Sequence, residues 1–455
     1  MADASVANAV AAGPTEADLE DIQGLVYSAY SKFGFVGYVL ARLDGGPERS
    51  RAWLAGIAPD ITPAAKHLRA HDRRTHVALS PLGIVALGQP LLAGLPQEAK
   101  DGMASRARVL RDDPPETWEL GGGDDRLDVL VIVYAREPAA RDTMVKQRVA
   151  ELEAAGAHVY PPQLSGPFTG HEPFGFADGL AQPFVHGHPG QPRAGQQTIA
   201  AGELLLGYEN AYAQMPASPL LPSDGFDLGR NGTYLVWRKL RQDVAGLWRW
   251  CAAAATSIDK PVDWLAAKVM GRWPSGASLA QTWLQDDPAY ADKAKLDDFG
   301  YLAADADGVR CPIASHVRRA NPRDARGGSS DDSLSVAARH RILRRGRPFG
   351  DPLADPRLGV DDGQARGLYF ICLQASIARG FEFIQQTWLG NHGFHGLYQE
   401  VDPIMGNGDN AGAVTIPASP FRYRLTNVPD VVHVMGGGYF LLPSRAAIAR
   451  LARGV

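Results

Sequence analysis

Apolar residues in the first part of the chain fall into two strand-and-helix units. The run FVGYVLARL (35–43) is almost continuously apolar and predicts a buried strand, and the segment before it predicts a helix from about Glu16. A second strand is predicted at 127–135. In the segment 140–156 that follows, apolar residues recur at the spacing of one helical face and end at a glycine, which is typical of an amphipathic helix.

The later part of the chain repeats this alternation. GLYFICLQA (367–375) predicts a strand, and residues 376–391 carry apolar side chains on one helical face. Another strand is predicted at 437–444, before a closing helix at 445–453. Each half therefore combines strands with helices packed on one face, which predicts an α+β fold of two related domains.

The segments between these units are predicted to be less regular. Residues 200–307 are rich in Trp, Pro and Gly, so we expect irregular chain there, with a helix or two around AGLWRWCAAAATSI. We interpret 323–335 as a polar loop. The predicted organisation is a flexible N-terminus at 1–15, an N-terminal domain at 16–190 and a C-terminal domain at 191–455.

Composition narrows the class of protein. With 455 residues, 45% of them hydrophobic and 21% charged, the chain is typical of a globular protein with more than one core. Its net charge of −4 and interleaved basic residues predict no nucleic-acid partner. We find no secretory or twin-arginine signal and no apolar run long enough for a bilayer, so we expect no membrane partner.

The three cysteines are widely spaced and form neither a metal-ligand pattern nor an even disulfide set. This usage predicts a reducing, cytoplasmic setting. The sequence leaves the oligomeric state open between a monomer and a homodimer.

One histidine lies in a basic segment, CPIASHVRRANPRD, in which His316 is followed by Arg318, Arg319 and Arg323. An imidazole beside several guanidinium groups suits a ligand that is both metallic and anionic. Heme fits this description, because its iron accepts an axial imidazole and its propionates need cationic donors. The alternative is an ordinary surface histidine near arginines.

A carboxylate stands between two glycines in GFADGLAQP, residues 175–183. Glycines on both sides of Asp178 let the backbone bend sharply and approach a cofactor closely. A positioned carboxylate can accept a proton and then return it to a departing group. The alternative is an Asx-type turn.

Four motifs occur in the order GFADG, HVRRANPR, RILRRGRPFG and GLYFICLQASIARGFEFIQQTW. Together they resemble the dye-decolourising peroxidase family, and the resemblance covers nearly the whole chain. It implies two ferredoxin-like domains, each an antiparallel sheet with peripheral helices, as in dimeric α+β barrel-type proteins. It also implies one heme b per chain, hydrogen peroxide reduced through a ferryl intermediate, and dyes, phenols and other aromatic reductants as substrates.

The resemblance assigns roles to individual residues. His316 matches the proximal ligand of the iron, Asp178 the distal acid-base residue, and Arg344 the distal arginine that stabilises charge as the O–O bond breaks. Leu368 and Phe370 match the apolar residues over the distal face of the heme.

Three further residues are assigned to the surroundings of the heme. Arg318 and Arg323 match residues near the propionates. Asp402 resembles the acceptor for the second ring nitrogen of His316, an arrangement that makes the imidazole more basic. Its alternative role is that of a turn residue before Pro403.

Bulky dyes cannot reach a buried iron, so the resemblance suggests oxidation at a surface aromatic residue. Trp388 is the candidate, and a core tryptophan that continues the apolar helical face is the alternative. Phe349 stands where many relatives have an oxidisable tyrosine, which leaves oxidation at the surface open.

Other basic residues carry weaker signals. Arg345 and Arg347 are interpreted as a solvated basic run, and His76 as a loop or surface residue.

The catalytic group also predicts a pH preference. An aspartate is ionised at lower pH than a histidine, with a reference pKa of about 3.9, so an acidic optimum is expected. Two alternatives from other classes are a non-catalytic protein that binds or stores heme, and a cargo protein packed inside a shell. The first would need His316 but neither Asp178 nor Arg344. The second usually carries an extension after its last helix, whereas this chain ends directly after it.

Overall fold

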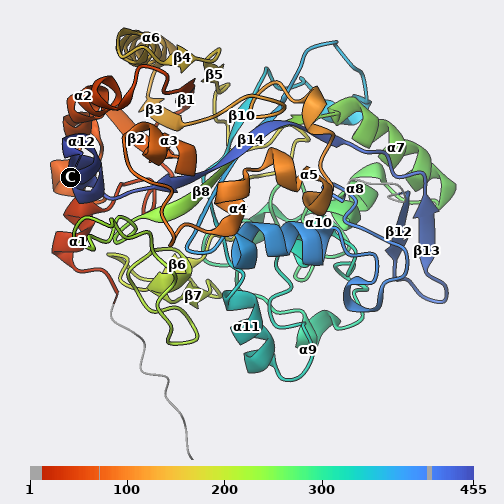
Figure 1. Cartoon of the computed structure of the whole chain (residues 1–455). Helices are drawn as coiled ribbons and strands as arrows, with labels where there is room; N and C mark the ends of the chain where they lie inside the picture. Colours follow the sequence, from red (N-terminus) through yellow and green to blue (C-terminus); the bar gives the residue numbers. More distant parts are fainter. Residues whose placement is uncertain (1–12, 71, 407–411, 455) are drawn as a thin grey trace, which may run out of the picture.

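The computed structural model describes residues 13–70, 72–406 and 412–454 (Figure 1). At its centre is a sheet of ten strands in which all neighbouring strands are antiparallel. The predicted α+β class is confirmed. None of the helices in the described ranges has the length and apolar composition needed to cross a membrane.

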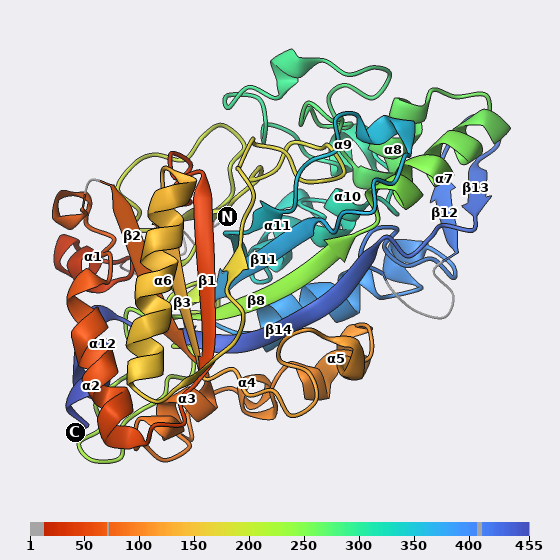
Figure 2. The same ribbon diagram turned by 90° about the horizontal axis from the view of Figure 1, so that it is seen from above.

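The first half of the chain supplies five strands of this sheet. They are β1 (Phe35–Arg42), β2 (Arg73–Leu79), β3 (Val129–Ala135), β4 (His158–Val159) and β5 (Gln163–Leu164). The helices of this half are α1 (Glu16–Asp21), α2 (Pro47–Ile57), α3 (Pro81–Ala86), α4 (Gln97–Asp101), α5 (Ala107–Leu110) and α6 (Pro138–Ala154). Helix α6 packs against β1 and β3, as Figure 2 shows.

The second half supplies the other five strands. They are β8 (Thr233–Gln242), β9 (Leu343–Arg344), β10 (Arg347–Phe349), β11 (Gly367–Gln374) and β14 (Val432–Leu442). Its helices are α7 (Val244–Ser257), α8 (Val262–Met270), α9 (Leu302–Asp305), α10 (His316–Ala320), α11 (Ser330–Ala338) and α12 (Arg445–Arg453). Two small pairs lie outside the sheet: β6 (Phe184–Val185) with β7 (Thr198–Ile199), and β12 (Ala413–Ile416) with β13 (Tyr423–Thr426).

The two groups of strands join edge to edge. The strand order is β10-β11-β8-β14-β2-β3-β1-β4, and β9 and β5 pair with β11 and β1. At the junction, β14 and β2 share the single residue pair Leu441 and Leu79. Helix α12 at the end of the chain packs on α2 near its start. The two halves therefore form one continuous sheet instead of two separate ones.

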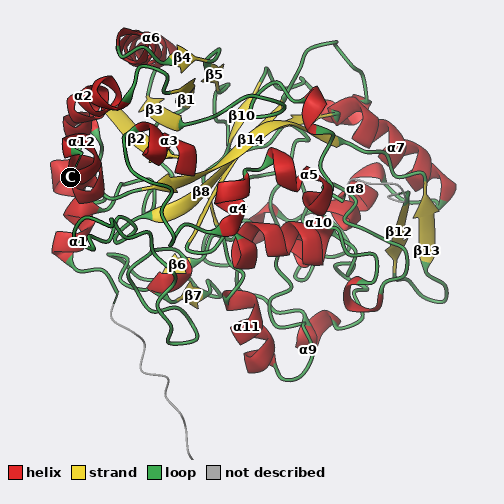
Figure 3. Ribbon diagram, viewed as in Figure 1, coloured by secondary structure: helices red, strands yellow, loops and turns green. Residues whose placement is uncertain are grey.

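Both faces of the sheet are covered by apolar side chains. Successive residues of β1, such as Val39 and Leu40, point to opposite faces and belong to different core clusters, as expected when a strand is buried on both sides. Figure 3 shows that loops make up much of the chain around β6, β7 and α9. The fold thus combines a rigid central sheet with long irregular segments on one side.

The central strand β8 lies inside the region predicted to be irregular. Its sequence, TYLVWRKLRQ, interrupts the apolar pattern with Arg238, Lys239 and Arg241. Arg238 is nevertheless fully buried, because it forms an ion pair with the buried carboxylate of Asp112. The prediction of irregular chain rested on the Trp, Pro and Gly content of 200–307 and is wrong for this strand. The helix predicted in the same region is confirmed as α7.

The segment predicted as a helix at 376–391 is helical but wound as π-helix over Ala378–Glu382 and Ile384–Leu389. The side chain of Gln374 accepts the N–H of Phe381 at 2.7 Å. This N–H is therefore diverted from the regular helical ladder, which provides a physical reason for the altered winding.

Several weaker predictions are corrected. Arg345 is buried and donates to the carbonyl oxygens of Leu25 and Val26, both at 2.8 Å. Arg347 is also buried and donates to the carbonyl of Ala29. These two arginines hold the 25–30 segment and are not solvated.

Other corrections concern local structure. His76 is fully buried, since it lies in β2 and stacks on Tyr30. The second half of the predicted loop at 323–335 begins α11, where the Ser329 hydroxyl accepts from the N–H of Asp332. The predicted flexible N-terminus falls largely on residues 1–12, outside the described residues, while Thr15 caps α1.

Candidate active site

A cavity is bounded by β8, β11, α10 and the segment around residues 172–181. Its apolar lining includes Phe174, Phe176, Leu180, Leu240, Met270, Val317, Ile342, Leu368, Phe370, Phe381, Ile384, Leu389 and Ile404. Its polar lining comprises Glu172, Asp178, Arg238, Gln242, Arg272, His316, Asn321, Arg323, His340, Arg341, Arg344 and Gln385. The predicted residues His316, Asp178, Arg344, Leu368, Phe370 and Arg323 are thus brought together.

His316 is the first residue of α10 and is held by a carboxylate from a distant loop. Its Nδ1 lies 3.0 Å from Oδ1 and 3.1 Å from Oδ2 of the fully buried Asp402. Because the carboxylate occupies Nδ1, the Nε2 atom of the same ring is left to bind a metal.

Asp402 combines the two roles considered for it. Its Oδ1 also accepts the N–H groups of Ile404, at 2.9 Å, and Met405, at 2.7 Å, as expected of a turn residue. Burial works against ionisation, but the charge and hydrogen bond of His316, together with Arg319, keep the pKa of Asp402 below its ordinary value. The residue is therefore an ionised acceptor for the imidazole proton.

Asp178 lies at the base of a tight hairpin. His171 and Ala177 form an antiparallel bridge, and the N–H of Asp178 donates to the carbonyl of Gly170 at 2.9 Å. The hairpin turns at Gly175, whose φ is +97°. This backbone places the carboxylate of Asp178 in the lining of the cavity.

The two glycines on either side of Asp178 allow backbone conformations with positive φ. Gly175 and Gly179 have φ values of +97° and +76°, in the region that favours glycine. A Cβ atom on Gly179 would meet no neighbouring atom, so close approach is not what requires glycine there. The N–H of Gly179 donates to Oδ1 of Asp178 at 2.5 Å, a contact between adjacent residues and not the i to i+2 contact of an Asx turn.

Arg344 faces the same carboxylate from β9. Its Nη1 lies 4.0 Å from Oδ1 of Asp178, and its Nη2 donates to the carbonyl of Leu180 at 2.7 Å. Its backbone N–H donates to the side chain of Gln182 at 3.0 Å. The guanidinium and the carboxylate are therefore positioned by the same segment, 178–182.

The wall beside these two groups is apolar. Leu368 and Phe370 lie on β11 and are paired with Leu240 and Arg238 of β8. Since paired residues of antiparallel strands share a face, all four side chains belong to the cavity face of the sheet. Arg238 was missed from the sequence, together with the strand that carries it.

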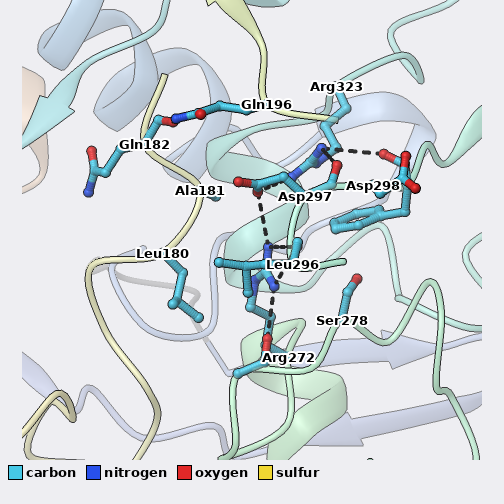
Figure 4. A network of polar contacts seen from close by, with 12 residues as sticks. Leu180, Ala181, Gln182, Gln196, Arg272, Ser278, Leu296, Asp297, Asp298 and Arg323 are labelled. Carbon is cyan, nitrogen blue, oxygen red and sulfur yellow. Dashed lines mark hydrogen bonds and ion pairs between the residues drawn. The ribbon is translucent and has the colours of Figure 1, made fainter. Parts of the chain in front are cut away.

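The two arginines predicted near an anionic group differ in position. Arg323 lines the cavity and donates to the carbonyl of Asp297 at 3.0 Å and to its carboxylate at 2.9 Å. Figure 4 shows Arg272 and Arg323 directed at the same 296–298 segment.

Arg318 does not line this cavity. Its guanidinium donates to the carboxylate of Asp305 at 3.0 Å and to the carbonyl of Cys311 at 2.7 Å. Both charged side chains are buried, so Arg318 belongs to the packing behind α10. Its contacts do not favour the role near the propionates that the sequence suggested.

Arg341 is a lining residue that the sequence analysis missed. Its Nη2 donates to the carbonyl of Ala181 at 2.6 Å, whereas its buried Nε has no hydrogen-bond partner among the described residues. Burial, with Arg323 and Arg344 nearby, lowers the pKa of Arg341 to about 9. A guanidinium that forms no ion pair with a carboxylate of the described residues suits an anionic group of a bound ligand. The sequence signal that could have found Arg341 is its position between His340 and Ile342, at the start of the motif RILRRGRPFG.

Trp388 is not at the surface. It is 1% exposed and belongs to a core cluster with Ile384, Leu389 and Phe394. The core alternative is therefore correct, because the residue lies on the inner face of the π-helical segment. Phe349 is also buried and lies against Tyr369.

Comparison with known proteins gives a consistent result. The family model described as "Dyp-type peroxidase, C-terminal" matches residues 207–400. The chain is 32% identical to Peroxidase 2 of Mycetinis scorodonius, over 96% of this chain and 88% of that protein. It is 28% identical to the dye-decolorizing peroxidase AauDyP1 of Auricularia auricula-judae, over 97% and 88% of the two chains.

Solved structures agree with these similarities. The crystal structure of a decolorizing peroxidase from Auricularia auricula-judae matches with a TM-score of 0.81 at 26% identity, over 95% of this chain and 99% of that one. An ancestral D-type dye decolorizing peroxidase matches with a TM-score of 0.80, over 95% and 98%. The expected ferredoxin-like α+β fold is therefore confirmed, and the chain belongs to the Dyp-type peroxidase family of hydrogen-peroxide-dependent oxidoreductases.

Proposed function

We propose that this peroxidase binds one heme b per chain in the cavity, reduces hydrogen peroxide there and oxidises dyes, phenols and other aromatic reductants. The observation that carries the proposal is the imidazole of His316, whose Nδ1 is held by Asp402, in one apolar cavity with Asp178 and Arg344. The dye substrates are proposed from the printed names of the relatives.

The residues of the cavity suit heme. The Nε2 atom of His316 would be free to bind the iron, and the lining is largely apolar, as a porphyrin requires. Arg341, with its unpaired Nε, and Arg323 provide cations at one edge, where anionic propionates would be bound. Leu368 and Phe370 would add apolar contacts to the ring.

When bound, heme supplies an iron that binds hydrogen peroxide and takes up its oxidising equivalents. Asp178 accepts a proton from one peroxide oxygen and returns it to the departing oxygen, which leaves as water. Arg344, with its guanidinium 4.0 Å from the carboxylate, stabilises the negative charge that develops during O–O cleavage. Asp402 keeps the proton on Nδ1 of His316 and thereby strengthens the imidazole as a ligand.

We propose an acidic optimum for this reaction. The acid-base residue is a carboxylate, which remains available as a base at pH values where a histidine would already be protonated. A rate profile with its maximum at or above neutral pH would contradict this part of the proposal.

The experiment is to load the full chain with heme, add hydrogen peroxide and follow the Soret band together with oxidation of a dye. Asp178→Asn and Arg344→Leu should each lower the rate with peroxide by at least about 100-fold, while His316→Ala should lose the axial ligand. Arg339→Leu, outside the cavity lining, is the matched control for loss of a cation. No spectral change of the wild type with peroxide would exclude the proposed function, and an active Asp178→Asn variant would transfer the acid-base role elsewhere.

A further inference from the structure

A second carboxyl group, that of Glu172, lines the same cavity as Asp178. The antiparallel bridge between His171 and Ala177 places Glu172 opposite Phe176, and its N–H donates to the Phe176 carbonyl at 2.9 Å. Asp178 is two residues beyond Phe176 on that strand. Diagonal neighbours of this kind share a face of a hairpin and are about 7–8 Å apart, so the two carboxyl groups are within electrostatic reach of each other.

Neutral donors hold the carboxyl group of Glu172. It accepts the N–H of Phe174 at 3.0 Å, the N–H of Phe176 at 2.9 Å and the side-chain amide of Gln242 at 2.9 Å. No ion pair between described residues includes Glu172. The group therefore lies in the cavity without the cationic partner that buried carboxylates usually have.

The contact with Gln242 fixes the orientation of that amide. Because its Nε2 donates to Glu172, its Oε1 must point away, and this buried oxygen has no hydrogen-bond partner in the described part of the chain. An unused acceptor thus stands next to a carboxyl group in the cavity lining, where Gln242 is 7% exposed.

We propose that Glu172 and Asp178 are a coupled carboxyl pair that holds one proton in the cavity, with the proton on Glu172 while Asp178 is ionised. Two carboxyl groups on one face of a hairpin repel each other when both are ionised, which favours a proton on one of them. Glu172 is thus a positioning residue for Asp178. Its effect on the peroxide reaction rests on the proposed function, whereas the shared proton does not.

The electrostatic surroundings support this assignment. Burial raises the pKa of Glu172 to about 7, the hydrogen bonds from Phe176, Phe174 and Gln242 oppose the rise, and the charge of Asp178 adds to it. The other charged or titratable side chains that line the cavity are Arg238, Arg272, His316, Arg323, His340, Arg341 and Arg344.

The proposal assigns a cause to the loss of activity at high pH. Below neutral pH the neutral Glu172 leaves Asp178 as the only ionised carboxylate of the pair. Above it, Glu172 becomes negative and opposes the stabilisation that Arg344 gives to developing negative charge. The alkaline limit of the peroxide reaction should therefore follow the ionisation of Glu172.

The direct test is an infrared titration of protonated carboxyl groups in the full chain as purified, which needs no turnover. A band that disappears near pH 7 in the wild type should be absent from Glu172→Gln and should move to lower pH in Asp178→Asn, by about half a pH unit or more. Gln242→Leu removes a donor to the ionised form and should move the band to higher pH. In Glu172→Gln a flipped Gln242 would offer its unused oxygen to the new amide, whereas the N–H of Phe174, which donates to the same Oε2, would lose its acceptor.

The second readout is the pH profile of the peroxide reaction. Glu172→Gln should move the alkaline limit of the peroxide reaction to higher pH by about one pH unit or more. Gln242→Leu should also move this limit to higher pH, as it moves the infrared band of Glu172. Glu203→Gln, which removes a buried carboxyl group outside the cavity lining, is the matched control and should shift neither readout.

Two results would overturn the pair: a wild-type band near neutrality that survives in Glu172→Gln, or a Glu172 band that does not move in Asp178→Asn. A band that behaves as expected in a chain that does not react with peroxide would support the pair and exclude the proposed function.

Discussion

The Nδ1 atom of His316 lies 3.0 Å from the carboxylate of Asp402, a residue 86 positions later in the chain. The carboxylate is in turn fixed by the N–H groups of Ile404 and Met405. The imidazole is therefore oriented by a turn whose geometry does not depend on any bound group.

Asp402→Asn should weaken the basic character of His316 and preserve the turn, because the amide oxygen can still accept from Ile404 and Met405. We expect the reduction potential of the heme iron to rise and the rate with hydrogen peroxide to fall by about 10- to 100-fold. Spectroelectrochemical titration and stopped-flow absorbance measure the two effects. An unchanged potential would show that Asp402 serves only the turn.

Arg318→Leu and Arg341→Leu should separate folding from heme binding. Loss of Arg318 leaves the buried carboxylate of Asp305 without its cation and should lower the free energy of unfolding by about 3 kcal/mol, with little effect on heme affinity. Arg341→Leu should instead weaken heme binding by about 10-fold or more, since it removes an unpaired cation from the cavity edge. Urea unfolding and heme titration of both variants provide the comparison, and the reverse pattern would restore the role of Arg318 near the propionates.

Trp388→Phe tests whether this tryptophan carries oxidation to the surface. Because Trp388 is buried in a core cluster, the substitution should lower stability modestly and leave the ratio of rates for a bulky dye and a small phenol unchanged. Steady-state kinetics with the two substrates measure this ratio. A selective loss of dye oxidation would assign a redox role to the buried ring.

Glu172 should make stability depend on pH. Its pKa is raised from 4.5 to about 7 in the folded chain, so the unfolded chain releases this proton first as the pH rises. The associated stability is complete below pH 4.5 and is lost as the pH rises to about 7. Glu172→Gln should flatten this part of the profile in urea unfolding at a series of pH values. A profile identical to that of the wild type would mean that the carboxyl group titrates at its ordinary value.

Some elements could be predicted from the sequence because their local pattern agrees with their tertiary environment. Strand β1 is an apolar run buried on both faces, and β11 is an apolar run with one face in the cavity wall. The motifs around Asp178, His316 and Arg344 are local segments. Strand β8 could not be found in this way, since Arg238 is compatible with burial only through Asp112, which lies far away in the sequence.

The residues of the cavity were also only partly predictable from local sequence. The contact of His316 with Asp402 was one of two roles open to that aspartate, and only the tertiary structure brings the two residues together. Arg318 and Arg323 are similar in sequence context but face different neighbours, because α10 ends between them and Arg323 adopts a positive φ of 51°. Glu172 carries no motif of its own, and its role depends on a hairpin and on Gln242 from another strand.

The ion pair between Asp112 and Arg238 joins the two halves of the chain at the cavity wall, since Arg238 lines the cavity. The hairpin with Asp178 comes from the first half, and the imidazole of His316 from the second. If the gene were divided near residue 190, each fragment would carry an incomplete pocket and one partner of a buried charge pair. Peroxidase activity should then depend on reassembly of the two fragments, which makes the appearance of the Soret band a reporter of their complementation.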